Sequence, residues 1–299
     1  MTNFITNSFQ EQVTSLVRSA VQQDDSRLRN TVQVSSKQGS AAQVADYVQL
    51  AAAPAKNLAS KSDTIYGDIN TTRRWVYGDT YRMPAILVDQ LDKLKTLNDP
   101  SGMYTKAIRS AMAREMDQVI NAALFAAAKT GVTGSGSTIF PTSTSTNVVA
   151  VGTGAAGNTG LNFQKITKAL QFLRKTNLDL TREELYMPIT AKLMDDLIND
   201  PEINNKMYGG LLDYDSGKLN RIMGVNIVSY EALDVDASGF VNVPLYAKSG
   251  IELGIWTDVS VTLTPQVATK NNNAQISSEM MIGATRLEEE KVIQIKCVA

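Results

Sequence analysis

The sequence predicts an α+β protein built around one long helix, with extended segments before it and a lobe of mixed helices and strands after it. Three observations support this fold class. A helical pattern of about 30 residues starts near residue 100, helices and strands alternate between about 160 and 250, and β patterns return in the last 50 residues. At 299 residues the chain is long enough for one large domain or two moderate ones with an apolar core.

The first 90 residues are predicted to form an arm followed by extended chain. Within residues 1–45, apolar side chains recur at helical spacing at Phe9, Val13, Leu16, Val17 and Ala20. One such face cannot form a core alone, so this helix packs either on its own domain or on a neighbouring molecule, and the pattern favours neither. Between 46 and 90, β-forming residues mixed with turn residues indicate a long hairpin or projecting loop.

The strongest local pattern is a helix over residues 100–129, here called the spine helix. Asp99 and Pro100 supply a capping side chain and a proline in the first turn, and Thr130 with Gly131 ends the helix. The apolar stripe consists of Ile108, Met112, Met116, Ile120, Ala123, Leu124 and Ala127. The charged residues expected on the other faces are Lys106, Arg109, Arg114 and Asp117. At 1.5 Å per residue the helix would be roughly 45 Å long. Such a helix is unusually long for a globular protein of this size, which indicates a structural role.

The remainder of the chain is predicted to alternate between strands and shorter helices. Residues 131–160 are rich in Gly, Ser and Thr and indicate a flexible or hairpin-bearing connection. A helix from Phe163 to Leu173, strands at 185–187 and 224–229, and a short helix capped by Thr190 then follow. Alternating residues at 259–264 and 291–297 predict two late strands, which we expect to complete the domain of the spine helix.

Composition excludes several classes of function. Lys and Arg total 29 and Asp and Glu total 30, so no global charge attracts the chain to nucleic acid or to anionic lipid. Histidine is absent and cysteine occurs once, at Cys297, which excludes Ser-His and Cys-His hydrolases, the usual zinc sites and an intrachain disulfide. Neither a secretory signal nor a membrane-spanning run is apparent, so we expect a soluble protein made in the cytoplasm.

Two loops resemble ligand-binding motifs only in part. Gly152, Gly154 and Gly157 fit the glycine pattern of a dinucleotide site, but the next helix begins too late and no acidic strand end follows, so we interpret the segment as a loop. Residues 234–239 resemble the first half of a calcium loop, but Leu245 stands where the bidentate glutamate is needed, which favours a surface turn.

The remaining polar clusters also have structural interpretations. The adjacent carboxylates 195–196 and 288–290 indicate a solvated helix end and a turn between strands, because acid–base pairs need convergent geometry that adjacency does not supply. The segment Arg73-Arg74-Trp75 combines two cations with an aromatic ring, as DNA-binding surfaces do. Because the chain is close to neutral, we interpret it as an interchain ion-pair site in preference to a DNA-binding site. We therefore expect no catalytic residues, no metal and no cofactor.

Although no single motif identifies a function, one set of residues, taken in its order along the chain, is specific enough to compare with known families. The set comprises Arg73-Arg74, Asp89, Asp92-Lys93, Asp99-Pro100, Tyr104, Arg114, Asp117 and Thr130-Gly131, then Tyr186, Pro188, Leu193, Leu197, residues 217–229 and residues 283–297. In this order the residues resemble the tailed-bacteriophage major capsid proteins with the Hong Kong ninety-seven type shell fold. The resemblance covers nearly the whole chain from about residue 3.

The resemblance implies a phage capsid fold with four parts. These are an N-terminal arm (1–45), an extended loop over a neighbouring subunit (46–85), a peripheral domain with the spine helix (86–159 and 251–299) and an axial domain (160–250). It also implies that the chain is not an enzyme and that copies form hexamers and pentamers of an icosahedral head around double-stranded DNA, without sequence-specific binding.

The resemblance also implies a location and a set of partners. The protein would be made in the host bacterial cytoplasm and located in the virion. It would contact other copies and a portal protein, with room for separate scaffolding and decoration proteins. Residues expected at interchain or interdomain contacts are Arg73, Arg74, Trp75, Asp89, Arg114 and Arg286.

Two alternatives remain at this point. An encapsulin-like bacterial compartment would share the fold but package cargo enzymes. A soluble enzyme using carboxylates would need a pocket lined by Asp or Glu.

Overall fold

The computed structural model describes residues 23, 25–49, 70–88, 101–144, 146–154, 157–176, 178–204, 221–267 and 273–298. In these ranges the chain divides into two compact units. The first contains the described parts of Met1–Ser26, Thr80–Arg114 and Thr257–Met280, and the second those of Arg27–Asp79, Glu115–Trp256 and Met281–Ala299. Two sequence predictions for the first hundred residues lie outside the described residues: the helix from Phe9 to Ala20 and the cap at residues 99–100.

The core of the second unit is a six-stranded sheet with the order β7-β14-β11-β8-β10-β9. Its strands are β7 (Val148–Val149), β8 (Leu185–Ile189), β9 (Arg221–Ile222), β10 (Val225–Ser229), β11 (Phe240–Ala247) and β14 (Val292–Val298). β14 pairs antiparallel with β11 from Val292↔Tyr246 to Val298↔Phe240 and parallel with β7. The strands predicted at 185–187, 224–229 and 291–297 are confirmed.

The last of these strands, β14, lies between β7 and β11 in the six-stranded sheet. Its residues Val292, Ile293, Ile295 and Cys297 are buried. That residues 291–297 complete the domain of the spine helix stays a prediction. Alternation showed that the segment is a strand, but alternation carries no information about the partner strand.

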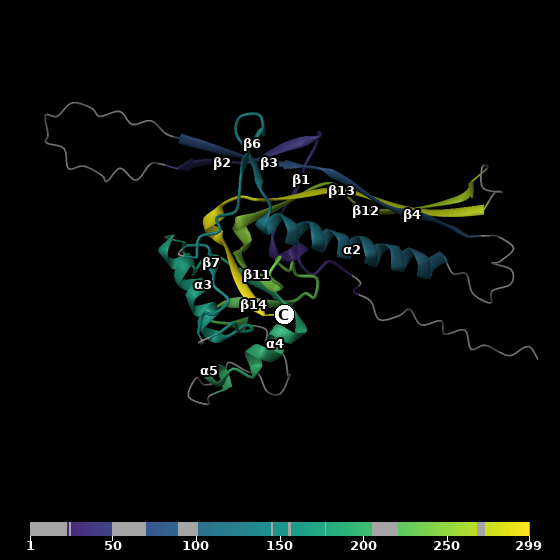
Figure 1. Cartoon of the computed structure of the whole chain (residues 1–299). Coiled ribbons are helices and arrows are strands. Elements are labelled where there is room, and N and C mark those ends of the chain that lie inside the picture. The colour runs from purple at the N-terminus through teal and green to yellow at the C-terminus, as the bar shows by residue number, and fades with distance from the viewer. Residues whose placement is uncertain are drawn as a thin grey trace, which may run out of the picture. The chain divides into compact units, whose positions relative to one another are not determined.

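Short helices accompany the six-stranded sheet. They are α3 (Phe163–Lys175), α4 (Ala191–Ile198) and α5 (Pro201–Asn204), and α3 packs on β14 and β7 (Figure 1). Asn162 caps α3 by accepting a hydrogen bond from the Lys165 amide at 2.9 Å, and Thr190 caps α4 as predicted. The helix predicted from Phe163 to Leu173 is confirmed, with Ile166, Ala169, Leu170 and Leu173 buried.

A second sheet contains the hairpin that the sequence predicted between residues 46 and 90. It has the order β2-β3-β5-β6, with β2 (Ala41–Gln49), β3 (Asn70–Tyr77), β5 (Ala128–Thr130) and β6 (Gly136–Thr138). β2 and β3 pair antiparallel from Ala41↔Tyr77 to Gln49↔Asn70, with a bulge between Gln43 and Ala45. β5 and β6 form a hairpin whose loop and second strand lie in the Gly-rich connection, residues 131–160.

The third sheet has the order β1-β12-β13-β4. Its strands are β1 (Gln33–Ser36), β4 (Asp79–Val88), β12 (Ile251–Val267) and β13 (Asn273–Arg286). The strand predicted at 259–264 is part of β12. β3 and β4 are separated only by Gly78, so the chain passes from one sheet to another at this glycine.

Two glycines permit that passage. A Cβ at Gly78 would lie 2.8 Å from the indole ring of Trp256, and a Cβ at Gly283 in β13 would overlap the backbone carbonyl oxygen of Tyr77. Only residues without a side chain fit where β3 leaves one sheet and crosses β13 of the other.

The spine helix is α2 (Ser101–Phe125), 25 residues long. Its buried side chains include Ile108, Met112, Met116, Ile120 and Leu124, which confirms the predicted stripe. The predicted end at residue 129 is wrong, because residues 128–130 form β5 and pair with β3, which leaves Ala127 exposed beyond the helix. In the described ranges, no helix is long and apolar enough to cross a lipid bilayer.

Three short 3₁₀ turns complete the described chain. They are η2 (Arg29–Thr31), η4 (Lys248–Gly250) and η6 (Glu289–Lys291). η6 joins β13 to β14, so the acidic run 288–290 is a turn between strands, as predicted.

Candidate functional site: a buried arginine–glutamate cluster

Arg74, Arg286 and Glu289 form a buried cluster in the second unit. Both oxygens of the Glu289 carboxylate accept hydrogen bonds from Nη2 of Arg74, at 2.8 and 2.6 Å. Nη2 of Arg286 lies 3.6 Å from Oε1 of the same carboxylate. The side chains of Arg74 and Arg286 are 5% and 0% exposed, so the pairs are largely shielded from water.

Arg286 also caps the end of the spine helix. Its Nη1 donates to the carbonyl oxygens of Leu124 and Ala126 at 2.8 and 2.9 Å. A cation here satisfies carbonyls that have no partner in the last turn and opposes the negative end of the helix dipole. The guanidinium lies over the ring of Phe140, 5.1 Å from its centroid, and Phe140 meets Phe125 edge-on.

The cluster carries more positive than negative charge. Two guanidinium groups share one carboxylate, and burial lowers the pKa of Arg286, with Glu289 raising it and Arg74 lowering it further. Nε and Nη1 of Arg74 and Nε of Arg286 have no hydrogen-bond acceptor among the described residues. Glu289 is therefore the group on which both arginines depend.

The sequence-predicted contact residues lie in different environments. Arg74 and Arg286 pair within the chain, and in the division expected from the sequence the Arg74–Glu289 pair joins the extended loop to the peripheral domain. Arg73 and Trp75 are half-buried on β3, and Arg114 is exposed on α2. Asp89 lies outside the described residues, and contact of any of these with another copy stays a prediction.

Asp117, expected on a face of the spine helix other than the apolar stripe, is fully buried. Its carboxylate oxygens accept hydrogen bonds from the backbone amides of Arg27 and Leu28 at 3.1 and 3.0 Å. Leu28 is itself fully buried, and Arg27 donates through Nη1 to the carbonyl oxygen of Ser229 at 2.7 Å. Asp117 thus fixes the segment just before η2 to the spine helix.

A third buried cation, Lys165 on α3, was not predicted from the sequence. Its Nζ donates to the carbonyl oxygens of Thr159, Gly160 and Lys296 at 2.8, 2.8 and 3.0 Å. Burial lowers the pKa of Lys165, and the neighbouring Cys297 thiol opposes this shift. Burial likewise raises the pKa of Cys297 to about 12. The lysine links α3, the preceding loop and β14.

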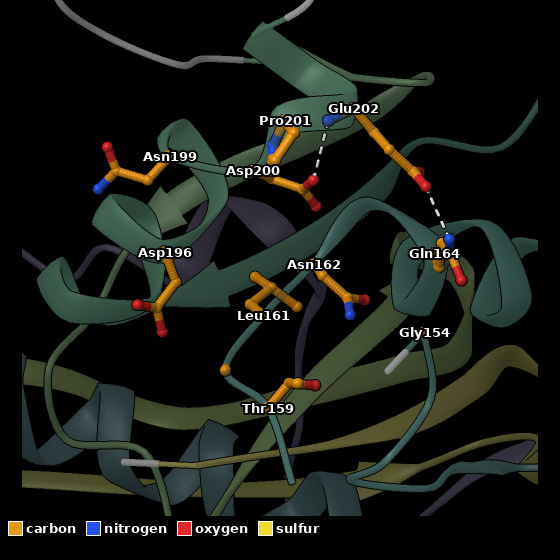
Figure 2. Close-up of a pocket in the computed structure, with 11 residues that line it drawn as sticks. Gly154, Thr159, Leu161, Asn162, Gln164, Asp196, Asn199, Asp200, Pro201 and Glu202 are labelled. Atoms are coloured by element: carbon orange, nitrogen blue, oxygen red, sulfur yellow. Dashed lines mark hydrogen bonds between the residues drawn. The ribbon is translucent and has the colours of Figure 1, made fainter. Parts of the chain in front are cut away.

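A pocket of about 330 Å³ lies beside the glycine turn, lined in part by Asp196, Asp200 and Glu202 (Figure 2). Both oxygens of Asp200 accept backbone amides, from Phe163 at 2.8 Å and from Glu202 at 3.0 Å. Glu202 in turn accepts a hydrogen bond from the Gln164 side chain at 2.7 Å. Two of the three carboxylates thus hold helix ends together, which is not the arrangement of a general acid–base pair.

The two loops that resemble ligand-binding motifs are turns. Gly154 has φ +89° and borders the acidic pocket, where carboxylates would repel a pyrophosphate, and α3 begins only at Phe163. In the other loop, Asp236 pairs with Lys296 at 2.8 Å and accepts the amides of Ser238 and Phe240. Across the described residues no group of three or more metal-binding side chains is arranged around a common point.

Comparison with protein families gives a match over almost the entire sequence. Residues 5–299 match the family described as "Phage capsid protein". The chain belongs to this phage capsid family. The resemblance to tailed-phage capsid proteins drawn from the sequence is confirmed, and membership makes the chain a structural component of a phage particle. A comparison with curated protein sequences found no match.

Solved structures of phage capsids share the fold of this family member. The capsid of Cyanophage P-SCSP1u matches at TM-score 0.72 and 14% identity, over 98% of this chain and 94% of that chain. The capsid of Ralstonia phage GP4 matches at TM-score 0.72 and 12% identity, over 100% and 98%. Mycobacterium phage Che8 gives TM-score 0.68 at 15% identity, over 97% of both chains. The α+β capsid fold expected from the sequence is confirmed.

Proposed function

We propose that this phage capsid protein is the major capsid protein of a tailed phage. Copies would assemble as hexamers and pentamers into an icosahedral head that encloses double-stranded DNA. The observation that carries the proposal is the family match over residues 5–299, together with a fold that covers nearly the full length of phage capsid chains. The role is structural and not enzymatic, in keeping with carboxylates that are used to hold helix ends.

The charge balance suits a DNA container. With 29 basic and 30 acidic residues, the chain has no net attraction for phosphate, so the genome can be enclosed without being bound tightly to the wall. The proposed partners are other copies and a portal protein, with scaffolding supplied by a separate protein or by the arm.

The expected division assigns parts of the chain to parts of a shell. The arm (1–45) and extended loop (46–85) would reach neighbouring subunits, the spine helix would lie in the peripheral domain, and 160–250 would close around the symmetry axes. Arg73, Trp75, Arg114 and Asp89 are the proposed contacts between copies. Arg74 and Arg286 would act indirectly, by fixing the root of the hairpin β2–β3 on the end of α2.

The test is assembly of the purified chain, alone and with a co-expressed scaffolding protein. Sedimentation and negative-stain electron microscopy should show rings, tubes or closed shells. A protein that stays monomeric under both conditions would refute the proposal. If the shells formed in cells enclose enzymes instead of DNA, the assignment of the fold would stand, but the function would be that of a cargo compartment.

A further inference from the structure

The sheet β2-β3-β5-β6 has one buried face and one outer face. Along β3, Arg74 and Val76 are 4% and 1% exposed, whereas Trp75 and Tyr77, which alternate with them, are partly exposed. Successive side chains of a strand point to opposite faces, so Trp75 and Tyr77 lie on the outer face. Lys129 stands directly opposite Trp75 in the pairing of β3 with β5 and is exposed on the same face.

The hairpin β5–β6 adds two highly exposed apolar side chains to this region. Trp75 donates through Nε1 to the carbonyl oxygen of Gly131 at 2.8 Å, and the Tyr77 hydroxyl contacts that of Gly134 at 3.4 Å. The aromatic rings thereby hold the loop of the hairpin, which projects from the sheet (Figure 1). Val132 and Ile139 are left 72% and 74% exposed. We call Trp75, Tyr77, Lys129, Val132 and Ile139 the tip patch.

The tip patch is a positively charged apolar surface, and such a surface fits an acidic apolar partner. The described chain offers one complementary site. Val235 is 57% exposed, and it is the only strongly exposed large apolar residue in the described ranges with an acidic residue on each side. Asp236 is held by Lys296, which leaves the exposed Asp234 as the charge beside Val235.

We propose that the tip patch of one copy docks on the Asp234–Val235 corner of a second copy. The inference rests on the proposed shell function and deepens it by naming the two contact surfaces. Because two different surfaces meet, the contact is heterologous, and repetition of such a contact closes into a ring when the rotation allows it. Lys129 would approach Asp234, and Val132 or Ile139 would cover Val235.

Cross-linking tests the contact independently of shell closure. Val132→Cys and Val235→Cys are prepared as separate proteins and mixed, so that a disulfide between the two positions can form only between copies. Cys297, the single natural cysteine, is buried and does not compete. The control replaces Val235→Cys by Arg182→Cys, an exposed position elsewhere. We expect the cross-linked yield to exceed the control by about tenfold or more, because docking raises the local thiol concentration.

Charge reversal provides the second measurement. Lys129→Glu and Asp234→Lys should each raise the protein concentration needed for association by roughly tenfold, since an attraction becomes a repulsion. Combining both changes in one protein should restore association. Circular dichroism should show unchanged folding for all three variants, since both positions are exposed.

The outcomes distinguish failure of the docking contact from failure of the shell function. Assembled shells with cross-links above the control and rescue by the double change support both. Shells without the cross-link, or without rescue, overturn the docking contact and leave the shell function standing. Cross-linked small oligomers that never form shells, even with scaffold, support the contact and refute the shell. If neither assembly nor cross-links are observed, both proposals are overturned.

Discussion

Replacing Glu289 by alanine is the sharpest test of the buried cluster. The substitution removes the one carboxylate that faces two guanidinium groups, Arg74 with two hydrogen bonds of 2.8 and 2.6 Å and Arg286 at 3.6 Å. After the change, two like charges remain close together in a region where their side chains are 5% and 0% exposed. Neither arginine can turn to water without leaving its place in the fold.

The expected cost follows from burial. Removing one partner of a buried ion pair costs about 3–5 kcal/mol, because the other charge is left without compensation. The Glu289 side chain is itself 19% exposed, so the lower part of that range, about 3 kcal/mol, is expected. For a chain of this size that corresponds to a fall of about 6 °C in Tm.

Unfolding in urea and by heat, followed by tryptophan fluorescence, measures this loss. Trp75 lies beside Arg74 on β3, so it reports on the same hairpin root. The matched control is Glu288→Ala, which breaks a more exposed ion pair with Lys291 and should cost less than about 1 kcal/mol. If Glu289→Ala loses no more stability than this control, the cluster does not hold the hairpin to the helix.

Four further predictions concern the second unit. Lys165→Met should lower the free energy of unfolding by at least about 2 kcal/mol, measured in urea, because three buried carbonyl oxygens lose their donor; an unchanged urea midpoint would contradict this. Cys297, with its pKa raised from 9.0 to about 12 by burial, should resist thiol reagents at pH 8 until urea unfolds the chain. Since the folded pKa lies above the unfolded one, the contribution of Cys297 to stability is present below about pH 9 and should be lost as pH rises from about 9 to 12; Cys297→Ala should remove this pH-dependent contribution. Gly283→Ala should destabilise by more than about 2 kcal/mol through overlap with the Tyr77 carbonyl, whereas Gly157→Ala, with open space around it, should be nearly neutral by the same thermal melt.

The elements with strong periodicity could be predicted from sequence, and their partners could not. The apolar stripe from Ile108 to Leu124 correctly predicted the spine helix, and Thr190 correctly predicted the start of α4. The end of the spine helix was placed four residues too late, because Ala126 and Ala127 are good helix formers and the pairing of β5 with β3 overrides that preference.

The buried charges were beyond local reasoning. Glu289 was predicted only as part of a turn between strands, and its partner Arg74 lies 215 residues away in the chain. The burial of Asp117 was not predicted, because it depends on two backbone amides, of Arg27 and Leu28, that lie 90 and 89 residues away in the chain. β11 was not predicted because Pro244 interrupts a run without alternation. On the side away from β14, the described chain pairs with β11 only at its two ends, through Tyr246 and Ala247 with β8 and through a bridge from Val241 to Val235.

The position of β14 has a consequence for synthesis on the ribosome. β14 lies between β7 and β11, although it is translated after every other strand of its sheet. A nascent chain that has emerged only as far as β13 has a gap between β7 and β11, and the Lys296 carbonyl that receives Lys165 does not yet exist. The second unit therefore completes its core only after β14 has been translated, so its final folding follows the synthesis of the last strand.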